Sequence, residues 1–169
     1  MLFRSCVAAR EAAARIHIRQ MSSAEGVDVF SALRGGCGAT AEVTPHNLRL
    51  DDSALLALGP VAKVAPPLRP PSDVAAMQRA LAQRVVDIVA TDHAPHLPAE
   101  KAAGDRDIWK APGGIAGVQT FLPVMLGLVA DGHLTLPDLV RTCATESARI
   151  FRLPSKGRIA VGADRSEEH

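Results

Sequence analysis

Aromatic residues are scarce in this 169-residue sequence: they make up 3% of it, and tyrosine is absent. Proteins that hold single-stranded nucleic acid stack its bases on surface aromatic side chains, so the composition argues against that class. The formal net charge is only +1, which provides no strongly basic surface for nucleic acid or for an anionic membrane. We therefore expect neither kind of partner.

Cysteines are few, and long apolar runs are lacking. Cys6, Cys37 and Cys143 are far apart and odd in number, so they form neither a zinc-knuckle spacing nor a disulfide framework. We interpret them as free thiols of a cytoplasmic protein. No apolar run approaches the roughly 18 residues that a membrane span needs. The N-terminus also lacks the apolar segment and small-residue cleavage site of a signal peptide.

Both ends of the sequence are expected to be foreign to the protein. Residues 2–5 can be encoded by CTCTTCCGATCT and residues 165–169 by AGATCGGAAGAGCAC, and the second string begins with the reverse complement of the first. Together they read as one common sequencing-adapter string in its two directions. We therefore predict that residues 1–5 and 165–169 are translated adapter, and leave them out of reasoning about the fold.

Three segments have the pattern of short strands, and each is followed by helical spacing. Residues 16–20 alternate, residues 39–43 end at Thr44-Pro45, and residues 85–90 are β-branched and nearly all apolar. Residues 91–115 are expected to form a long loop, which is unusual unless it is functional. An Ala-rich helical stretch is expected to end at residues 11–15, and a second helix to run from a cap at Ser22 or Ser23 to Gly35-Gly36. Further helices are expected over 51–58, 73–83, 118–130, 136–144 and 146–151.

Strands that are each followed by a helix, without hairpin turns, pair in parallel. The sequence therefore predicts an α/β fold, equivalent to about the last three units of a (β/α)8 barrel. We assign residues 6–157 to this partial barrel and residues 158–164 to the start of a C-terminal extended segment. Three units leave free sheet edges, so we expect the isolated segment to be poorly soluble.

Catalytic residues of such barrels lie at the C-terminal ends of the strands, which directs attention to residues 20–22, 44–47 and 91–96. The third place is the strongest, because Asp92 follows the most apolar strand and has His93 and His96 beside it. A carboxylate there can ligate a divalent metal or take a proton from a metal-bound water. On spacing alone, Asp92 capping the loop between solvated histidines is an equal alternative.

Other polar residues have a structural interpretation that the pattern alone favours. His46 is expected to be a buried histidine satisfied by the backbone, and Trp109 to pack the long loop. Lys63 and Arg69 flank a proline-rich loop and could meet a carboxylate substrate, although ordinary surface charge is the simpler interpretation. Gly113-Gly114 would let the backbone approach a ligand, or simply form a flexible turn.

Several segments, in this order and spacing, resemble dihydroorotases of the hydantoinase-related amidohydrolases. The resemblance covers nearly all of the chain between the two suspect ends. It is carried by AEVTPH at 41–46, KVAPPLR at 63–69, DIVATDHAPH at 87–96 with Glu100-Lys101, APGGIAGV at 111–118, ARIF at 148–151 and KGRIAVGAD at 156–164.

The resemblance implies a barrel with one or two zinc ions that hydrolyses a cyclic amide, interconverting dihydroorotate and N-carbamoyl-aspartate in pyrimidine biosynthesis. By this resemblance Asp92 ligates metal and carries the proton from the attacking hydroxide to the leaving nitrogen. His96 binds substrate, and the backbone of Gly113 and Gly114 holds the pyrimidine ring. Most metal ligands, a His-x-His and a modified lysine, would lie in an N-terminal half that this sequence does not include.

Four positions depart from the family pattern. Gln20 stands where a metal-ligand histidine is expected, Ala65 where an asparagine contacts substrate, Gly113 where phenylalanine is usual, and Asn47 where a second histidine is frequent. A glutamine oxygen is a poor zinc ligand compared with imidazole, which leaves the number of metals open.

The departures leave alternative functions open. One is a relative acting on hydantoin or allantoin, and another is a non-catalytic homologue that serves as a scaffold for aspartate transcarbamoylase. The implied assemblies are a homo-oligomer or a complex with that transcarbamoylase. The isolated chain is expected to be inactive, because its barrel is incomplete.

Overall fold

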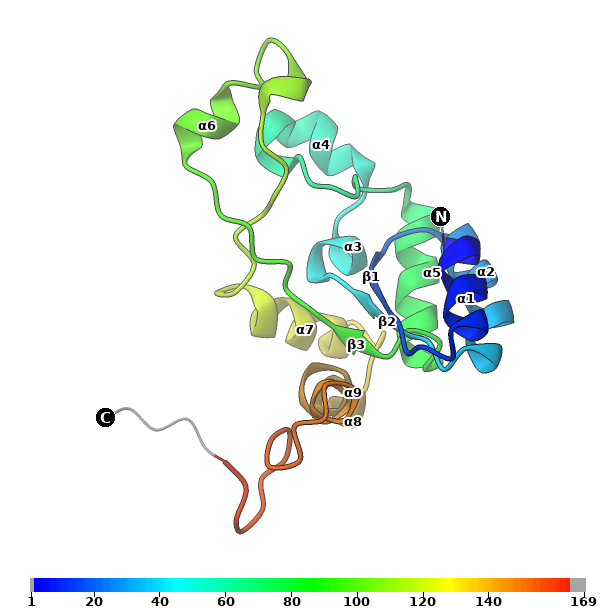
Figure 1. The fold of residues 1–169 in the computed structure, drawn as a ribbon. Coiled ribbons are helices and arrows are strands. Elements are labelled where there is room, and N and C mark those ends of the chain that lie inside the picture. Colours follow the sequence, from blue (N-terminus) through cyan, green and yellow to red (C-terminus); the bar gives the residue numbers. More distant parts are fainter. Residues whose placement is uncertain (1, 165–169) are drawn as a thin grey trace.

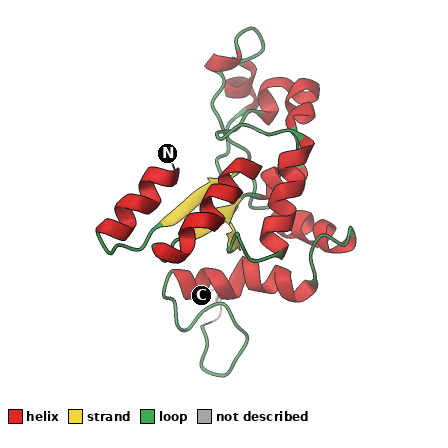
Figure 2. Cartoon of the chain, turned by 90° about the vertical axis from the view of Figure 1, so that its right-hand side faces the viewer, coloured by secondary structure: helices red, strands yellow, loops and turns green. Residues whose placement is uncertain are grey.

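The computed structural model describes residues 2–164 and contains three parallel strands in the order β1-β2-β3 (Figure 1). These are β1 (His17–Met21), β2 (Thr40–Val43) and β3 (Ile88–Val89). Residue 18 of β1 lies opposite residue 41 of β2, and residue 43 of β2 lies opposite residue 89 of β3. The small sheet lies in the middle of the molecule with helices around it (Figure 2). The predicted strand–helix order with parallel pairing is thus confirmed.

Helices follow each strand and also precede the first. They are α1 (Leu2–Glu11), α2 (Ala24–Leu33), α3 (Pro45–Arg49), α4 (Asp52–Leu58), α5 (Pro71–Ala82), α6 (Pro98–Ala102), α7 (Phe121–Ala130), α8 (Leu136–Val140) and α9 (Glu146–Ile150). The predicted adapter residues 2–5 fall within α1, whereas Met1 and residues 165–169 lie outside the described residues.

The third strand is shorter than the predicted 85–90. The amides of Val85 and Val86 both donate to the Ala80 carbonyl, at 2.8 and 3.1 Å, and so end α5 rather than pair with β2. Pairing with β2 begins at Asp87, whose amide donates to the Ala41 carbonyl at 3.0 Å. Residues 85–86 of the apolar run therefore end α5, and residues 87–89 pair with β2. Both parts are rich in β-branched residues, so the sequence did not separate them.

Three other expectations need correction. The segment 91–115 is not all loop, because it contains α6 and a 3-10 turn at Ile108–Lys110. The helices predicted at 136–144 and 146–151 are joined by a π-helical turn at Arg141–Thr145. Helix α3 was missed because Thr44-Pro45 indicated only a strand end, whereas Thr44 caps this helix and Pro45 occupies its first turn.

The two faces of the sheet differ in polarity. Ala41 and Val43 of β2 are fully buried, in one cluster with Phe30, Met77 and Leu81 from α2 and α5. Side chains alternate between the faces of a strand, so the intervening Thr40 and Glu42 lie on the opposite face. This second face carries the polar groups described below.

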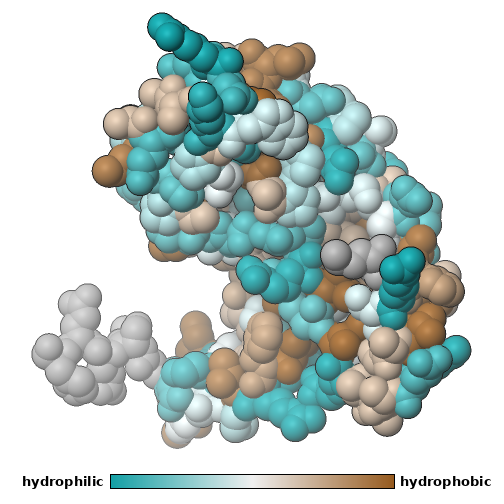
Figure 3. Space-filling model, turned by 45° about the horizontal axis from the view of Figure 1, so that its top comes forward, coloured by the Kyte–Doolittle hydropathy of each residue, from teal (hydrophilic) through white to brown (hydrophobic). Residues whose placement is uncertain are grey.

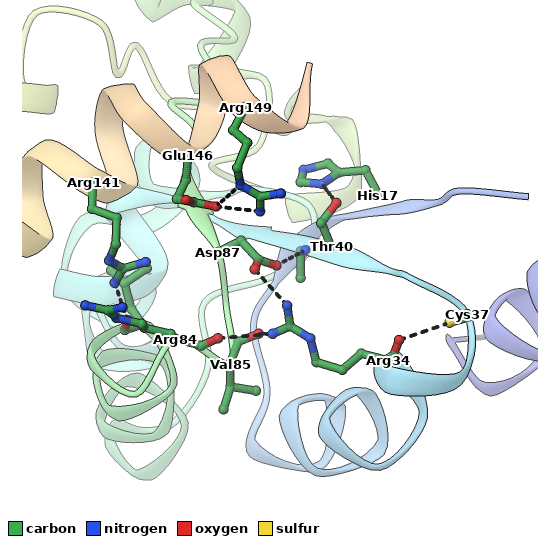
Figure 4. A network of polar contacts seen from close by, with 12 residues as sticks. His17, Arg34, Cys37, Thr40, Arg84, Val85, Asp87, Arg141, Glu146 and Arg149 are labelled. Atoms are coloured by element: carbon green, nitrogen blue, oxygen red, sulfur yellow. Dashed lines mark hydrogen bonds and ion pairs between the residues drawn. The ribbon is translucent and has the colours of Figure 1, made fainter. Parts of the chain in front are cut away.

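A buried carboxylate fixes the start of β3 (Figure 4). Asp87 accepts one hydrogen bond from Arg34 at 2.8 Å and another from the Ala41 amide at 2.8 Å. The Arg34 guanidinium also donates to the carbonyls of Arg84 and Val85. A buried charge with several hydrogen bonds is tolerated, and here it ties the end of α2 to both neighbouring strands.

Hydrophobic side chains lie between hydrophilic ones on the surface, as Figure 3 shows for one face. Among the described helices, none has the length and apolar character to cross a membrane. Residues 158–161, predicted to be extended, do not join the described sheet, and Ile159 and Val161 are fully exposed.

Candidate active site

Gln20 and Asp92 meet where β1 and β3 end. The Gln20 side chain donates to Asp92 Oδ2 at 2.5 Å, and both residues are left-handed, with φ of 55° and 46°. The pairing of β1 with β2 is irregular between Ile18 and Met21, so a bulge turns Gln20 out of the regular alternation. Left-handed backbone is uncommon outside glycine and gathers at functional sites. The local backbone thus directs both side chains toward one point.

Charged residues connect this point to the polar face of the sheet. Arg19 lies between two carboxylates, 3.4 Å from Asp92 Oδ1 and 3.4 Å from Glu42 Oε1. His17 approaches Glu42 at 3.1 Å and Thr40 at 2.7 Å. Burial alone would raise the pKa of Glu42, but hydrogen bonds and charges from His17 and Arg19 outweigh it and lower that pKa. Glu42 is therefore held as a carboxylate.

His46 of α3 is buried beside the same site. Burial lowers its pKa, opposed in part by the charge of Asp92, so the neutral imidazole is favoured. A neutral imidazole can accept a hydrogen bond or bind a metal. The neighbouring Asn47 is also buried, and neither polar atom of its side chain has a partner among the described residues. His46 lines a cavity of about 190 Å³ together with Thr91, Ile115 and Gly117.

His93 holds the loop that follows β3. Its Nδ1 accepts from the amides of Gly117 and Val118 at 3.1 and 3.2 Å, while the Ala94 amide donates to the Ile115 carbonyl at 3.1 Å. Because Nδ1 is an acceptor, the proton of a neutral ring lies on Nε2. His93 and Ala94, near the start of the loop, are therefore tied to residues 115–118, where the loop ends.

The predicted substrate residues His96 and Gly114 are in direct proximity. A Cβ at Gly114 would lie 2.5 Å from the Ala94 carbonyl oxygen and 3.1 Å from His96 Nε2, and its φ is 156°. Only glycine fits there. A Cβ at Gly113 would instead make ordinary contacts, with Ala65 N the nearest atom at 3.5 Å. His96 and Gly114 line a cavity of about 310 Å³.

Two lysines brace this loop. The ammonium of buried Lys101 donates to the carbonyls of Lys63 and Pro112 at 2.9 and 3.1 Å, and that of Lys63 donates to Ile108 and Ala111 at 2.7 and 2.6 Å. Burial lowers the pKa of Lys101, and the charge of Lys63 lowers it further. Lys63 therefore binds backbone here rather than a carboxylate. The dipeptide Glu100-Lys101 was one of the segments that resemble dihydroorotases, but no structural role was predicted for it.

Trp109 and Arg69 also depart from the simplest interpretations of the sequence. Trp109 was predicted to pack the loop, but it is 85% exposed, with Lys63 Nζ 5.7 Å from its ring centre. Arg69 Nε is buried without a partner among the described residues.

The described residues contain no group of three or more His, Cys, Asp or Glu side chains that could together hold a metal ion. Asp92 offers a carboxylate and Gln20 an amide. A metal centre at this site would therefore need ligands from outside these residues.

Sequence comparisons relate the chain to dihydroorotases, although no family model matches it. It is 46% identical over 154 residues to the dihydroorotase of Halobacterium salinarum, which covers 91% of this chain and 35% of the relative. It is 43% identical over 157 residues to that of Mycobacterium tuberculosis, with coverages of 92% and 36%. The chain thus spans about a third of the length of the relatives it matches and corresponds to their C-terminal portion.

Solved structures of hydantoinases have the same fold over this portion. L-hydantoinase of Arthrobacter aurescens superimposes with a TM-score of 0.92 at 31% identity, and the dihydropyrimidinase of Brevibacillus agri with 0.91 at 28%. Each match covers 96% of this chain and 37% of the other. The predicted fold class, the C-terminal part of an amidohydrolase barrel, is confirmed.

Proposed function

We propose that this chain, similar over nearly all its length to the C-terminal portion of dihydroorotases, forms one side of the active site of a cyclic amidohydrolase. The whole protein would interconvert dihydroorotate and N-carbamoyl-aspartate, in the cytoplasm. The observation that carries the proposal is the placement of Asp92. It lies at the C-terminal end of β3, hydrogen-bonded to Gln20, in the loop that also presents His96 against Gly114.

Asp92 is assigned the proton transfer. Its side chain is 21% exposed, and its carboxylate takes the proton of the attacking hydroxide and gives it to the ring nitrogen that leaves. His96 is assigned to the anionic group of the substrate, and the backbone of Gly113 and Gly114 to the polar edge of the ring. Gly114 supports both assignments, because its lack of a side chain lets its backbone lie close to His96 Nε2. The histidine and the Gly114 backbone can then face the same substrate.

A zinc centre fits these residues in part. Asp92 is a suitable ligand, whereas the amide of Gln20 is a poor substitute for imidazole and already donates to Asp92. We assign Asp92 as the ligand from this chain and the remaining ligands to the preceding part of the protein. When bound, zinc polarises the amide carbonyl and lowers the pKa of a bound water to about 7.

The test uses the complete protein encoded by the source locus. We expect zinc-dependent ring opening of dihydroorotate, and Asp92→Asn should lower kcat by about 100-fold or more. Asp131→Asn, at an exposed ion pair with Arg49, is the matched control and should retain activity. Metal content is measured on each variant, so that loss of zinc is separated from loss of proton transfer.

Three outcomes would change the assignment. Ring opening of hydantoin or allantoin, without dihydroorotate, would replace the substrate and keep the reaction class. An upstream region without His-x-His, together with no hydrolysis, would refute the enzyme and favour a scaffold for aspartate transcarbamoylase. A fully active Asp92→Asn variant would refute the role of Asp92.

A further inference from the structure

Two cysteines that lie 31 positions apart face the same small cavity. Cys6 on α1 is 2% exposed, and Cys37, just after α2, is half-buried. The cavity has a volume of about 190 Å³ and is completed by Val7, Arg10 and Leu33, and by Phe3 from the segment predicted to be foreign. None of these residues belongs to the candidate active site, so the pair needs an explanation of its own.

The two thiols face each other across this cavity, since both line it. Burial raises the pKa of the Cys6 thiol, and a hydrogen bond to the Cys37 side chain raises it further. The Cys37 sulfur also approaches the carbonyls of Leu33 and Arg34, at 3.5 and 3.8 Å. Figure 4 shows Cys37 beside Arg34 at the end of α2. This contact holds Cys37 beside the helix that packs on α1.

We propose that Cys6 and Cys37 form a reversible disulfide by exchange with a low-molecular-weight disulfide such as oxidised glutathione. The Cys37 thiolate attacks one sulfur of the reagent, forms a mixed disulfide and releases one thiolate. Cys6 then loses its proton to solvent and attacks the Cys37 sulfur, which releases the second thiolate. In total, two protein thiols are oxidised to one disulfide and one reagent disulfide is reduced to two thiols.

The surroundings assign the order of the two steps. Cys37 is half-buried whereas Cys6 is buried, so a disulfide reagent in solution reaches the Cys37 sulfur first. Cys6 is buried with a raised pKa, which suits the thiol that reacts second, once the mixed disulfide is next to it. Cys143 does not line this cavity. Burial raises the pKa of its thiol, and its sulfur lies 3.7 Å from the Thr142 hydroxyl oxygen.

The cross-link would join α1 to the end of α2 and enclose β1 in the closed loop. Closing a loop of this length removes conformational freedom from the unfolded chain. We expect the oxidised chain to unfold about 5–15 °C above the reduced chain. The pair would be reduced in a reducing compartment and closed under oxidation.

The experiment treats the complete protein encoded by the source locus, in native buffer, with oxidised glutathione. Peptide mapping of the non-reduced product should show a Cys6–Cys37 linkage, and intact mass should fall by about 2 Da relative to the reduced chain. The same reaction in urea is the reference, because an unfolded chain should give mixed pairings among Cys6, Cys37 and Cys143. Cys143→Ser should behave like the parent chain.

Cys37→Ser and Cys6→Ala should give no cross-link and no change of Tm on oxidation. Cys37 is half-buried, so its variant remains informative even if loss of Cys6 from the core destabilises the fold. A stable glutathione adduct on Cys37 without cross-link in the parent chain would overturn the proposal. Equal mixtures of pairings in native buffer and in urea would overturn it as well, since the fold would then bring no pair together.

Discussion

The side chains of Gln20 and Asp92, 72 positions apart in sequence, meet at 2.5 Å across the ends of β1 and β3. Both residues are in the left-handed region, which non-glycine residues occupy at a cost of about 1–2 kcal/mol. The hydrogen bond lies at the end of the strands where barrels of this kind place their chemistry. The strained backbone and the contact therefore belong to one feature, the site itself.

The first prediction concerns this strain. Gln20→Ala loses the hydrogen bond and keeps the strain, whereas Gln20→Gly loses the bond and relieves the strain. We expect the glycine variant to be the more stable by about 0.5–1 kcal/mol, measured by urea unfolding. Gln78, within α5, is the helical control. There Gln78→Gly should be about 1 kcal/mol less stable than Gln78→Ala. A less stable Gln20→Gly would mean that the left-handed backbone carries no strain.

The second prediction concerns pH and Glu42. Its pKa is lowered from the usual 4.5 in the folded state, so its ionised form stabilises the fold above that pH. Near pH 7, Glu42→Gln should lower the free energy of unfolding by about 1–3 kcal/mol. The difference should shrink as the pH falls below 4.5, because the wild-type carboxylate then takes up its proton. Denaturant unfolding across pH checks this, and exposed Glu11→Gln should change stability by less than about 0.5 kcal/mol.

The third prediction compares two adjacent glycines. Gly114→Ala places a Cβ 2.5 Å from the Ala94 carbonyl oxygen, so the loop must shift, and we expect a loss of about 2 kcal/mol or more. Gly113→Ala makes only ordinary contacts and should stay within about 1 kcal/mol of the parent. Thermal unfolding measures both. Similar losses in the two variants would show that the loop is not fixed against Ala94 and His96.

The fourth prediction concerns the lysine brace. Lys101→Met leaves the Pro112 carbonyl without this donor and the Lys63 carbonyl with the Gly114 amide alone, which should destabilise the fold by about 1–3 kcal/mol. Lys110→Met removes a charge that is 71% exposed and should have an effect below about 0.5 kcal/mol. Trp109, the single tryptophan, reports on the same loop by fluorescence. An unchanged spectrum and stability in Lys101→Met would refute the brace.

The fifth prediction concerns the 169-residue chain by itself. The strands β1 and β3 lie at the edges of the described sheet, and large apolar side chains such as Leu56 and Ile159 are exposed. We expect the chain to self-associate and to lack ring-opening activity, because the described residues do not complete a metal site. Size-exclusion chromatography and a zinc-supplemented assay test this. A soluble monomer with zinc-dependent activity would contradict it.

Local patterns were sufficient where a local cause decides the structure. A cap at Ser22 or Ser23 and the helical spacing through Phe30 predicted α2, which Ser23 caps, and the alternation at 16–20 predicted β1 within one residue. Predictions based on pattern were less accurate where tertiary contacts compete for the backbone. Val85 and Val86 have a strand composition, yet their amides end α5. Trp109 was expected to be packed in the loop, yet Lys63 holds that loop through backbone carbonyls and leaves the ring exposed.

The sequence by itself determined the order of the strands and of the helices apart from α3 and α6, the parallel pairing and the segment around Asp92, because periodicity and turn residues act over a few neighbours. Only the tertiary structure decided which side chains meet. It placed Gln20 on Asp92, Lys101 on the carbonyl of Lys63, and Cys6 and Cys37 on one cavity. Such contacts depend on a bulge, on left-handed residues and on the packing of distant elements, and these follow from the fold of the whole chain rather than from any one segment.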